Sequence, residues 1–134
     1  MGTVLIPDSL MKEIHTLVDN SYNDLENISF RGFPVGKIAQ YDFILETKYI
    51  YTSQATIPNK DLYAVYIKNT ALAIAIADRI CEQYKPSLFL TFHEYAECQA
   101  VRYSAEKHNV ARMAVTYPVH YNIDGSRFAI WKST

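Results

Sequence analysis

The spacing of apolar residues predicts helices along the first two thirds of the chain. An apolar stripe that recurs every three to four residues predicts a helix over residues 9–21, and a second helix is expected over residues 36–47. Residues 59–84 carry the clearest helical pattern. The middle of that segment is apolar nearly all round, so we expect this helix to be deeply packed. Between the first two helices, residues 28–30 are expected to form a short strand.

The segment 85–117 has the pattern of one strand–helix–strand unit. Residues 87–92 form a short apolar run without helix or strand breakers, as is typical of a buried parallel strand. Residues 94–109 return to helical periodicity, and residues 110–117 form a second strand-like run. This alternation predicts an α/β fold that is Rossmann-like, with a small, mainly parallel sheet flanked by helices.

Composition narrows the class of protein. The chain has 134 residues, of which 49% are hydrophobic and 20% charged, so we expect a single α/β domain rather than a disordered chain. A formal net charge of −1 argues against nucleic acid as a partner. The longest hydrophobic stretch, residues 70–77, is too short for a membrane span. Cys81 and Cys98 are expected to be reduced thiols, and we expect a cytoplasmic location without a signal peptide.

The glycine-containing sequence GFPVGK, residues 32–37, resembles a phosphate-binding P-loop only in part. Three residues separate its glycines where the P-loop has four, and Ile38 follows the lysine where a Ser or Thr is required. Hydrolysis of a nucleoside triphosphate is therefore not expected. The segment is either a tight turn that enters a helix or, with Arg31 and Lys37 beside that helix N-terminus, a spot that attracts anions.

Histidines follow both predicted strands. His93 and Glu94 come directly after the first strand, and His120 follows the second. Because the carboxyl ends of parallel strands meet at one edge of a sheet, His93 and His120 would face the same crevice. His93 could act there as a general base that Glu94 orients. Alternatively, Glu94 and Glu97 only favour the first turn of the next helix through its dipole.

The string His93-Glu94-Tyr95-Ala96-Glu97 also invites comparison with zinc proteases. Their pattern requires a second histidine at the position of Glu97, so we expect neither a metal nor another cofactor. A small metallohydrolase that uses His93 and Glu97 is the least favoured of the enzyme hypotheses.

Three segments together resemble a known family. The loop ISFRGFPVGK, the long apolar helix, and YKPSLFLTFHEY with the following VARMAVTYP resemble the N-terminal, acceptor-side half of GT-B-type glycosyltransferases of bacterial capsule and surface-polysaccharide synthesis. The resemblance covers residues 28–120. The chain departs from that pattern at Ser87, where an acidic residue is usual, and at residues 109–111, which lack the usual glycine and proline.

The resemblance implies an acceptor-side domain that is a fragment of a larger two-domain protein, inactive without a second domain for the sugar nucleotide. His93 and Glu94 would be catalytic, and a carbohydrate acceptor would contact five further residues: Arg31, Gly32, Lys37, Tyr95 and His120. The alternative is a non-catalytic interaction module that pairs with another domain or subunit, and a homo-oligomer is one such arrangement.

Overall fold

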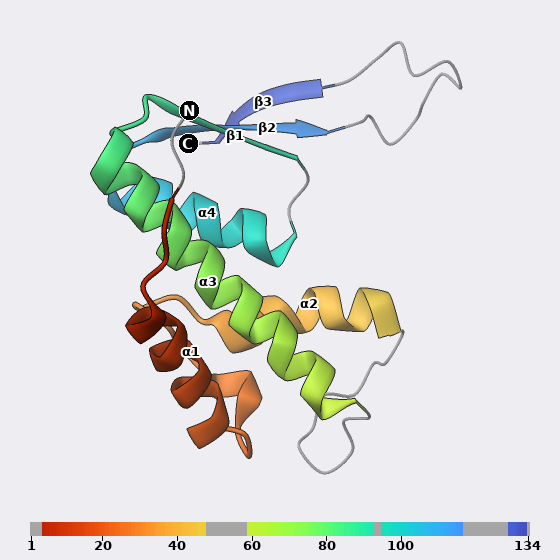
Figure 1. Cartoon of the computed structure of the whole chain (residues 1–134). Coiled ribbons are helices and arrows are strands. Elements are labelled where there is room, and N and C mark those ends of the chain that lie inside the picture. The colour runs from red at the N-terminus through yellow and green to blue at the C-terminus, as the bar shows by residue number, and fades with distance from the viewer. Residues whose placement is uncertain (1–3, 48–58, 93–94, 117–128, 134) are drawn as a thin grey trace.

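The computed structural model describes residues 4–47, 59–92, 95–116 and 129–133 (Figure 1). In chain order, the elements are α1 (Asp8–Asn20), the short 3-10 helix η1 (Leu25–Asn27), α2 (Val35–Thr47), α3 (Lys60–Tyr84), β1 (Leu88–Phe92), α4 (Ala96–Lys107), β2 (Ala111–Thr116) and β3 (Ala129–Ser133). The four predicted helices and the two strands of the predicted unit are confirmed. Two further segments lie outside the described residues: 49–52, whose pattern is ambiguous between a strand and a helix end, and 122–125, whose composition is typical of a turn.

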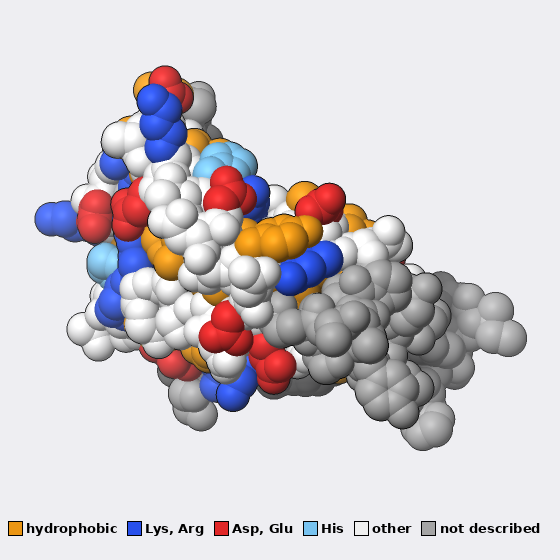
Figure 2. Space-filling view, turned by 90° about the horizontal axis from the view of Figure 1, so that it is seen from below, with side chains coloured by type: hydrophobic (Ala, Val, Ile, Leu, Met, Phe, Trp, Pro, Cys, Tyr) orange, Lys and Arg blue, Asp and Glu red, His pale blue; other side chains and the backbone are white. Residues whose placement is uncertain are grey.

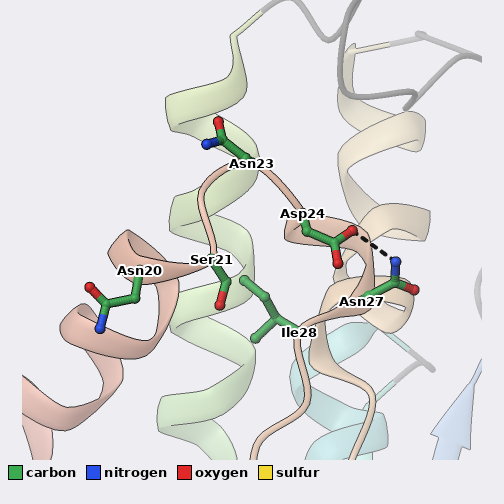
Figure 3. Close-up of a pocket in the computed structure, with 6 residues that line it drawn as sticks. All are labelled: Asn20, Ser21, Asn23, Asp24, Asn27 and Ile28. Carbon is green, nitrogen blue, oxygen red and sulfur yellow. Dashed lines mark hydrogen bonds between the residues drawn. The ribbon is translucent and has the colours of Figure 1, made fainter.

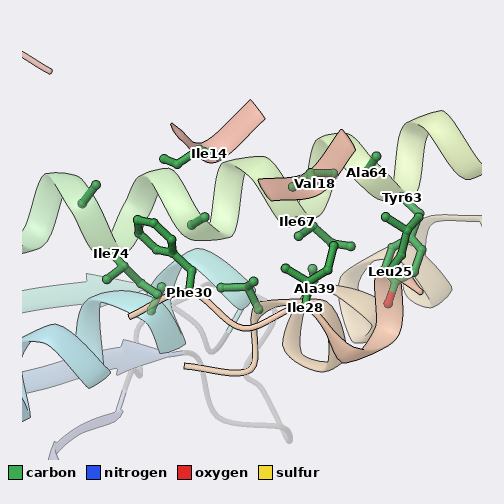
Figure 4. Close-up of a cluster of buried hydrophobic side chains, with 14 of the residues drawn as sticks. Ile14, Val18, Leu25, Ile28, Phe30, Ala39, Tyr63, Ala64, Ile67 and Ile74 are labelled. Atoms are coloured by element: carbon green, nitrogen blue, oxygen red, sulfur yellow. The ribbon is translucent and has the colours of Figure 1, made fainter. Parts of the chain in front are cut away.

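Helix α3 is the central element, and it contacts α1, α2 and α4. Its apolar side chains point in several directions, which lets one helix pack against three neighbours. Tyr63, Ile67 and Ile74 are fully buried, as the deep packing predicted from the sequence requires. Figure 4 shows them together with core side chains of the N-terminal half, among which Ile14, Val18, Leu25, Ile28, Phe30 and Ala39 are labelled.

The sheet contains three strands in the order β1-β2-β3. Strands β1 and β2 are parallel, with Leu88 opposite Ala111 and Phe92 opposite Val115. Strand β3 runs antiparallel to β2, with Ser133 opposite Arg112. The mixed α/β character is therefore confirmed. The sheet is less parallel than expected, because residues 129–133 carry no distinct strand signal in the sequence and add an antiparallel pairing.

The helices that the structure describes cover one face of the sheet. Helix α4 crosses between β1 and β2 and packs on both strands, where Thr91, Arg112 and Ala114 are buried (Figure 1). The alternate residues of β1 lie on the opposite face, and Leu88, Leu90 and Phe92 are 44%, 56% and 60% exposed. The expectation of a strand buried on both faces is thus wrong, because the described part of the chain places no helix over the second face.

The segment between η1 and α2 is a tight turn. Residues 28–30 do not form a strand, and Phe30 makes only an isolated bridge with Phe33 around Arg31 and Gly32, whose φ angles are 51° and 84°. Gly36 then packs so closely on η1 that a Cβ atom would lie 2.2 Å from the Leu25 carbonyl oxygen.

The first two backbone donors of α2 are used within the turn. The backbone N–H of Gly36 donates to the Ile28 carbonyl at 3.0 Å, and that of Val35 donates to the Phe33 carbonyl at 2.8 Å. The tight-turn interpretation of GFPVGK is therefore the one that the structure supports. The side chain of Lys37 is exposed on α2.

Charges are distributed without a dominant sign. On the face shown in Figure 2, acidic and basic side chains of the described residues alternate, which fits the small net charge. Among the helices that the structure describes, none has the length and apolar character needed to cross a membrane. Cys81 is buried and Cys98 is half-buried, and they are not joined in a disulfide.

Candidate functional site

A pocket of about 440 Å³ lies where α2, α3 and the N-terminus of α4 meet. We call it the Asp42 pocket. Helix α2 contributes an acidic side, α3 contributes one tyrosine, and the start of α4 contributes a second tyrosine and a further carboxylate. The lining residues are Asp42, Leu45, Glu46, Tyr66, Tyr95 and Glu97. Carboxylates and aromatic rings therefore meet where three helices come together.

Asp42 is the buried polar group of this pocket, with 8% of its surface exposed. Its Oδ2 accepts a 2.7 Å hydrogen bond from the backbone N–H of Ala96, so it caps α4 from a neighbouring helix. Its Oδ1 is buried and has no hydrogen-bond partner among the described residues. Burial raises the pKa of Asp42, the Ala96 bond lowers it, and the charge of Glu97 raises it further.

A hydrogen bond and the charges of all three carboxylates, Asp42, Glu46 and Glu97, raise the pKa of the Tyr66 hydroxyl. This hydroxyl donates the hydrogen bond to the Glu46 carboxylate. This bond raises the pKa of Tyr66 to about 12, with smaller contributions from burial and from the charges of Glu46, Asp42 and Glu97. A proton on Tyr66 is therefore firmly held, and the Tyr66 hydroxyl remains a hydrogen-bond donor at neutral pH.

A second group of ionisable side chains surrounds Asp78 on α3. Its Oδ2 accepts hydrogen bonds from Arg31 at 2.7 Å and from Lys107 at 2.9 Å. Its Oδ1 lies 3.0 Å from Nε2 of His108 and accepts a hydrogen bond from the Ser104 hydroxyl. Burial alone would raise the pKa of Asp78, but the bonds from Ser104, Lys107 and Arg31 lower it to about 2. We call this group the Asp78 network.

The residues predicted from the sequence are divided between these regions. Tyr95 lines the Asp42 pocket, whereas Arg31 belongs to the Asp78 network. Gly32 lies beside Tyr103, whose hydroxyl donates to the Arg31 carbonyl at 2.6 Å. Lys37 is absent from both groups. His93, Glu94 and His120 lie outside the described residues.

Sequence reasoning missed Asp42, Glu46 and Tyr66 as members of the site. One signal was available for Asp42, because Ala39, Asp42 and Phe43 recur at helical spacing and place a carboxylate on a buried stripe. A carboxylate is rarely buried without a partner, so its position on such a stripe is informative. Glu46 and Tyr66 are polar residues on helix surfaces and carry no comparable signal.

The turn between α1 and α2 forms a smaller hollow of about 230 Å³ (Figure 3). Its polar groups are largely paired with one another: Asn27 donates to Asp24 at 2.8 Å, and the backbone N–H of Asp24 donates to the Ser21 carbonyl at 2.8 Å. A hollow whose groups satisfy each other offers little to a ligand. The Asp42 pocket is therefore the better candidate.

Neither metal geometry nor similarity to known proteins assigns a role to the pocket. Within the described ranges, no group of three His, Cys, Asp or Glu side chains could hold a metal ion. Comparisons of the chain with protein-family models, with curated proteins and with solved structures gave no match. The chemistry of the pocket itself must carry the functional argument.

Proposed function

We propose that this chain is a Rossmann-like acceptor-side domain of a glycosyltransferase-like protein of surface-polysaccharide synthesis, and that the acceptor glycan binds in the Asp42 pocket. The observation that carries the proposal is the buried Oδ1 of Asp42, which has no hydrogen-bond partner among the described residues and belongs to a pocket lined by two tyrosines. An oxygen of this kind is costly unless a ligand or water donates a hydrogen bond to it. A sugar hydroxyl is such a donor.

The walls of the pocket suit a sugar ring. Tyr66 and Tyr95 present aromatic surface, on which the apolar face of a pyranose can pack, while their hydroxyls remain polar. Carboxylates accept hydrogen bonds from several hydroxyl groups at once. Concave sites that combine aromatic walls with a few convergent polar groups and a perturbed pKa are the usual form of ligand sites.

The charge of the pocket favours an acceptor over a sugar nucleotide. Asp42, Glu46 and Glu97 are three acidic residues, and none of the lining residues that the structure describes is basic. The phosphates of a nucleotide sugar would be repelled by these carboxylates. An acceptor without phosphate avoids this repulsion, in keeping with a domain that receives the sugar and leaves the nucleotide to another part of the enzyme.

Titration of the ¹⁵N-labelled chain with neutral oligosaccharides and with a sugar nucleotide tests the proposal. We expect the oligosaccharides to shift the amide signals of Tyr95, Ala96 and Glu97, and the sugar nucleotide to leave them unchanged. Asp42→Asn should weaken the oligosaccharide response. The substitution replaces one acceptor oxygen of the carboxylate with an NH₂ group, which donates hydrogen bonds and cannot accept one from a sugar hydroxyl. Asp19→Asn, on the exposed side of α1, is the matched control. Absence of any shift with every oligosaccharide would refute the proposal.

A second candidate function, an interaction module, is favoured by the exposed face of β1. Leu88, Leu90 and Phe92 form an uncharged apolar row on an edge strand, and a second copy of this chain is the occupant we propose for it. Identical uncharged faces can pair about a two-fold axis without repulsion. One such row supplies far less than the roughly 800 Å² per partner of a stable dimer, so we expect a weak, concentration-dependent dimer.

Sedimentation velocity over a wide concentration range tests this candidate. We expect the sedimentation coefficient to rise with concentration for the unaltered chain and to stay at the monomer value for Leu90→Glu. Leu5→Glu, at another exposed apolar residue, should leave the dimer in place. A monomer at every concentration would contradict the module.

A further inference from the structure

The two buried aspartates differ in one respect that points to the ligand. Asp78 receives bonds from two cationic side chains and lies beside a histidine, whereas among the described residues Asp42 receives a hydrogen bond only from a backbone N–H. We infer that the missing cation comes from the ligand, and that the acceptor of the Asp42 pocket is an amino sugar with a free amino group. This inference rests on the proposed function and deepens it.

The hydrogen bonds of the pocket leave room for an ammonium group. Glu46 accepts a bond from Tyr66, but this donor is neutral and adds no positive charge. Asp42 keeps one buried oxygen without a partner among the described residues. An ammonium group carries three donors and a full charge, so it can satisfy that oxygen and reach a second carboxylate at the same time.

The remaining walls favour an organic cation over a metal ion. Metal sites require several ligands that converge at short, fixed distances, and the described residues contain no such group. Tyr66, Tyr95 and Leu45 instead offer aromatic and aliphatic surface. Aromatic rings attract organic cations through their negative faces, and carboxylates nearby strengthen that attraction. A charged amine on a sugar ring combines the cation with a surface that packs on tyrosine.

The acidic residues of the pocket are not explained by helix stability alone. Glu97 lies in the first turn of α4, where a carboxylate is favoured by the helix dipole. Glu46 lies in the last turn of α2, where a negative charge is unfavourable, and Asp42 is buried at a cost. Two of the three carboxylates are therefore maintained against local stability, as expected of groups that serve a ligand.

Calorimetric titration with three tetrasaccharides of the same linkage tests the inference. The probes are the glucosamine tetramer with free amines, its fully N-acetylated form and the neutral glucose tetramer, at mildly acidic pH where the sugar amines are charged. We expect the free-amine tetramer to bind about tenfold more tightly than the other two, and this advantage to shrink as salt is added.

Variants locate the effect. Glu97→Gln and Glu46→Gln should each narrow the affinity difference between the free-amine and neutral tetramers, because the loss of a carboxylate charge weakens binding of the charged sugar most. Glu82→Gln, at an exposed position of α3 outside the pocket, should change neither, so it controls for a general loss of negative charge. Circular dichroism would identify a variant that unfolds. The comparison of the three sugars on the unaltered chain does not depend on any variant and still tests the inference.

The outcomes separate the inference from the function on which it rests. Equal binding of the three tetrasaccharides would overturn the amine inference and leave the acceptor function intact. Binding of none of them would overturn both. Binding of spermidine without binding of the glucosamine tetramer would also overturn both, because it would show an amine site that accepts no sugar.

Discussion

Asp42 and Asp78 are both buried carboxylates on the apolar stripes of packed helices, but they differ in the hydrogen-bond partners that surround them. Asp78 receives hydrogen bonds from several side chains, and its pKa falls to about 2. Asp42 receives a single backbone bond, and its pKa is raised. The difference teaches that burial by itself does not define a role. A satisfied carboxylate stabilises the fold, whereas a buried carboxylate with an unmatched oxygen is a candidate for contact with a ligand or water.

The Asp78 network joins segments that are far apart in the sequence. Arg31 reaches it from the turn before α2, Asp78 lies on α3, and Ser104 and Lys107 lie on α4. The network therefore fixes the turn and α4 onto α3. The Asp42 bond to Ala96 likewise joins α2 to the start of α4, but with one contact in place of four.

The largest expected effect is that of Asp78→Asn. The substitution leaves Arg31, Lys107 and His108 facing a neutral amide, so we expect the free energy of unfolding at neutral pH to fall by about 2 kcal/mol. The value is below that of a fully buried pair because 35% of the Arg31 side chain and 38% of the Lys107 side chain are exposed. Urea denaturation measures the change, with Asp19→Asn as the control.

The same variant makes a prediction about acid. Because the pKa of Asp78 lies below its ordinary value of 3.8, its contribution to stability is present above about pH 4 and is lost as the pH falls toward 2. The difference between the unaltered chain and Asp78→Asn should shrink over that window. A difference that persists unchanged at pH 2 would show that the network does not depend on the charge of Asp78.

A smaller loss is expected for Ser104→Ala. The Ser104 hydroxyl is buried and donates to Asp78, but the cationic partners of Asp78 remain after its removal. We expect a loss of about 1 kcal/mol in the free energy of unfolding. Ser87→Ala, at an exposed position, should cost little by comparison. Equal losses for the two variants would mean that the hydroxyl contributes nothing to the network.

Asp42→Asn should act in the opposite direction. The amide keeps an oxygen for the Ala96 N–H and removes a charge that burial disfavours, so we expect a gain of up to about 1 kcal/mol at neutral pH. A raised pKa means that the folded state holds the Asp42 proton more tightly than the unfolded chain. Stability of the unaltered chain is therefore lost as the pH rises through that raised pKa, and the gain should be absent in acid. Urea denaturation of both chains at neutral pH and in acid measures the gain, and the oligosaccharide titration of the variant measures the weaker glycan binding. A loss of stability would place Asp42 among the structural carboxylates.

The sequence predicts the framework around these carboxylates better than their environments. The helical stripe of α3 and the short apolar run of β1 follow local periodicity, which is why both are predicted nearly to the residue. Strand β3 and the partners of Asp78 depend on contacts between distant segments, and no local pattern encodes them. The sequence places a site at the carboxyl end of β1, whereas the Asp42 pocket is lined by residues of α2, α3 and the start of α4, among which Tyr95 is a predicted site residue. The acidic wall of the pocket on α2 depends on how two helices pack and could not be predicted.

The smallest effect on stability, and the sharpest test of the comparison, is expected from Glu97→Lys. The substitution removes one carboxylate beside Asp42 and supplies a cation, which makes its surroundings more like those of Asp78. The pKa of Asp42 should fall, as a ¹³C NMR titration of its carboxyl can measure. A cation in the first turn of α4 is unfavourable, so the net change in unfolding free energy should stay within about 0.5 kcal/mol. Binding of the glucosamine tetramer should be lost, because the site then carries its own cation.

Glu82→Lys makes the same charge change on α3 and should leave both the Asp42 titration and the binding of the tetramer unaltered. An Asp42 pKa that does not move would mean that Glu97 does not control it, and the contrast between the two aspartates would then depend on burial alone.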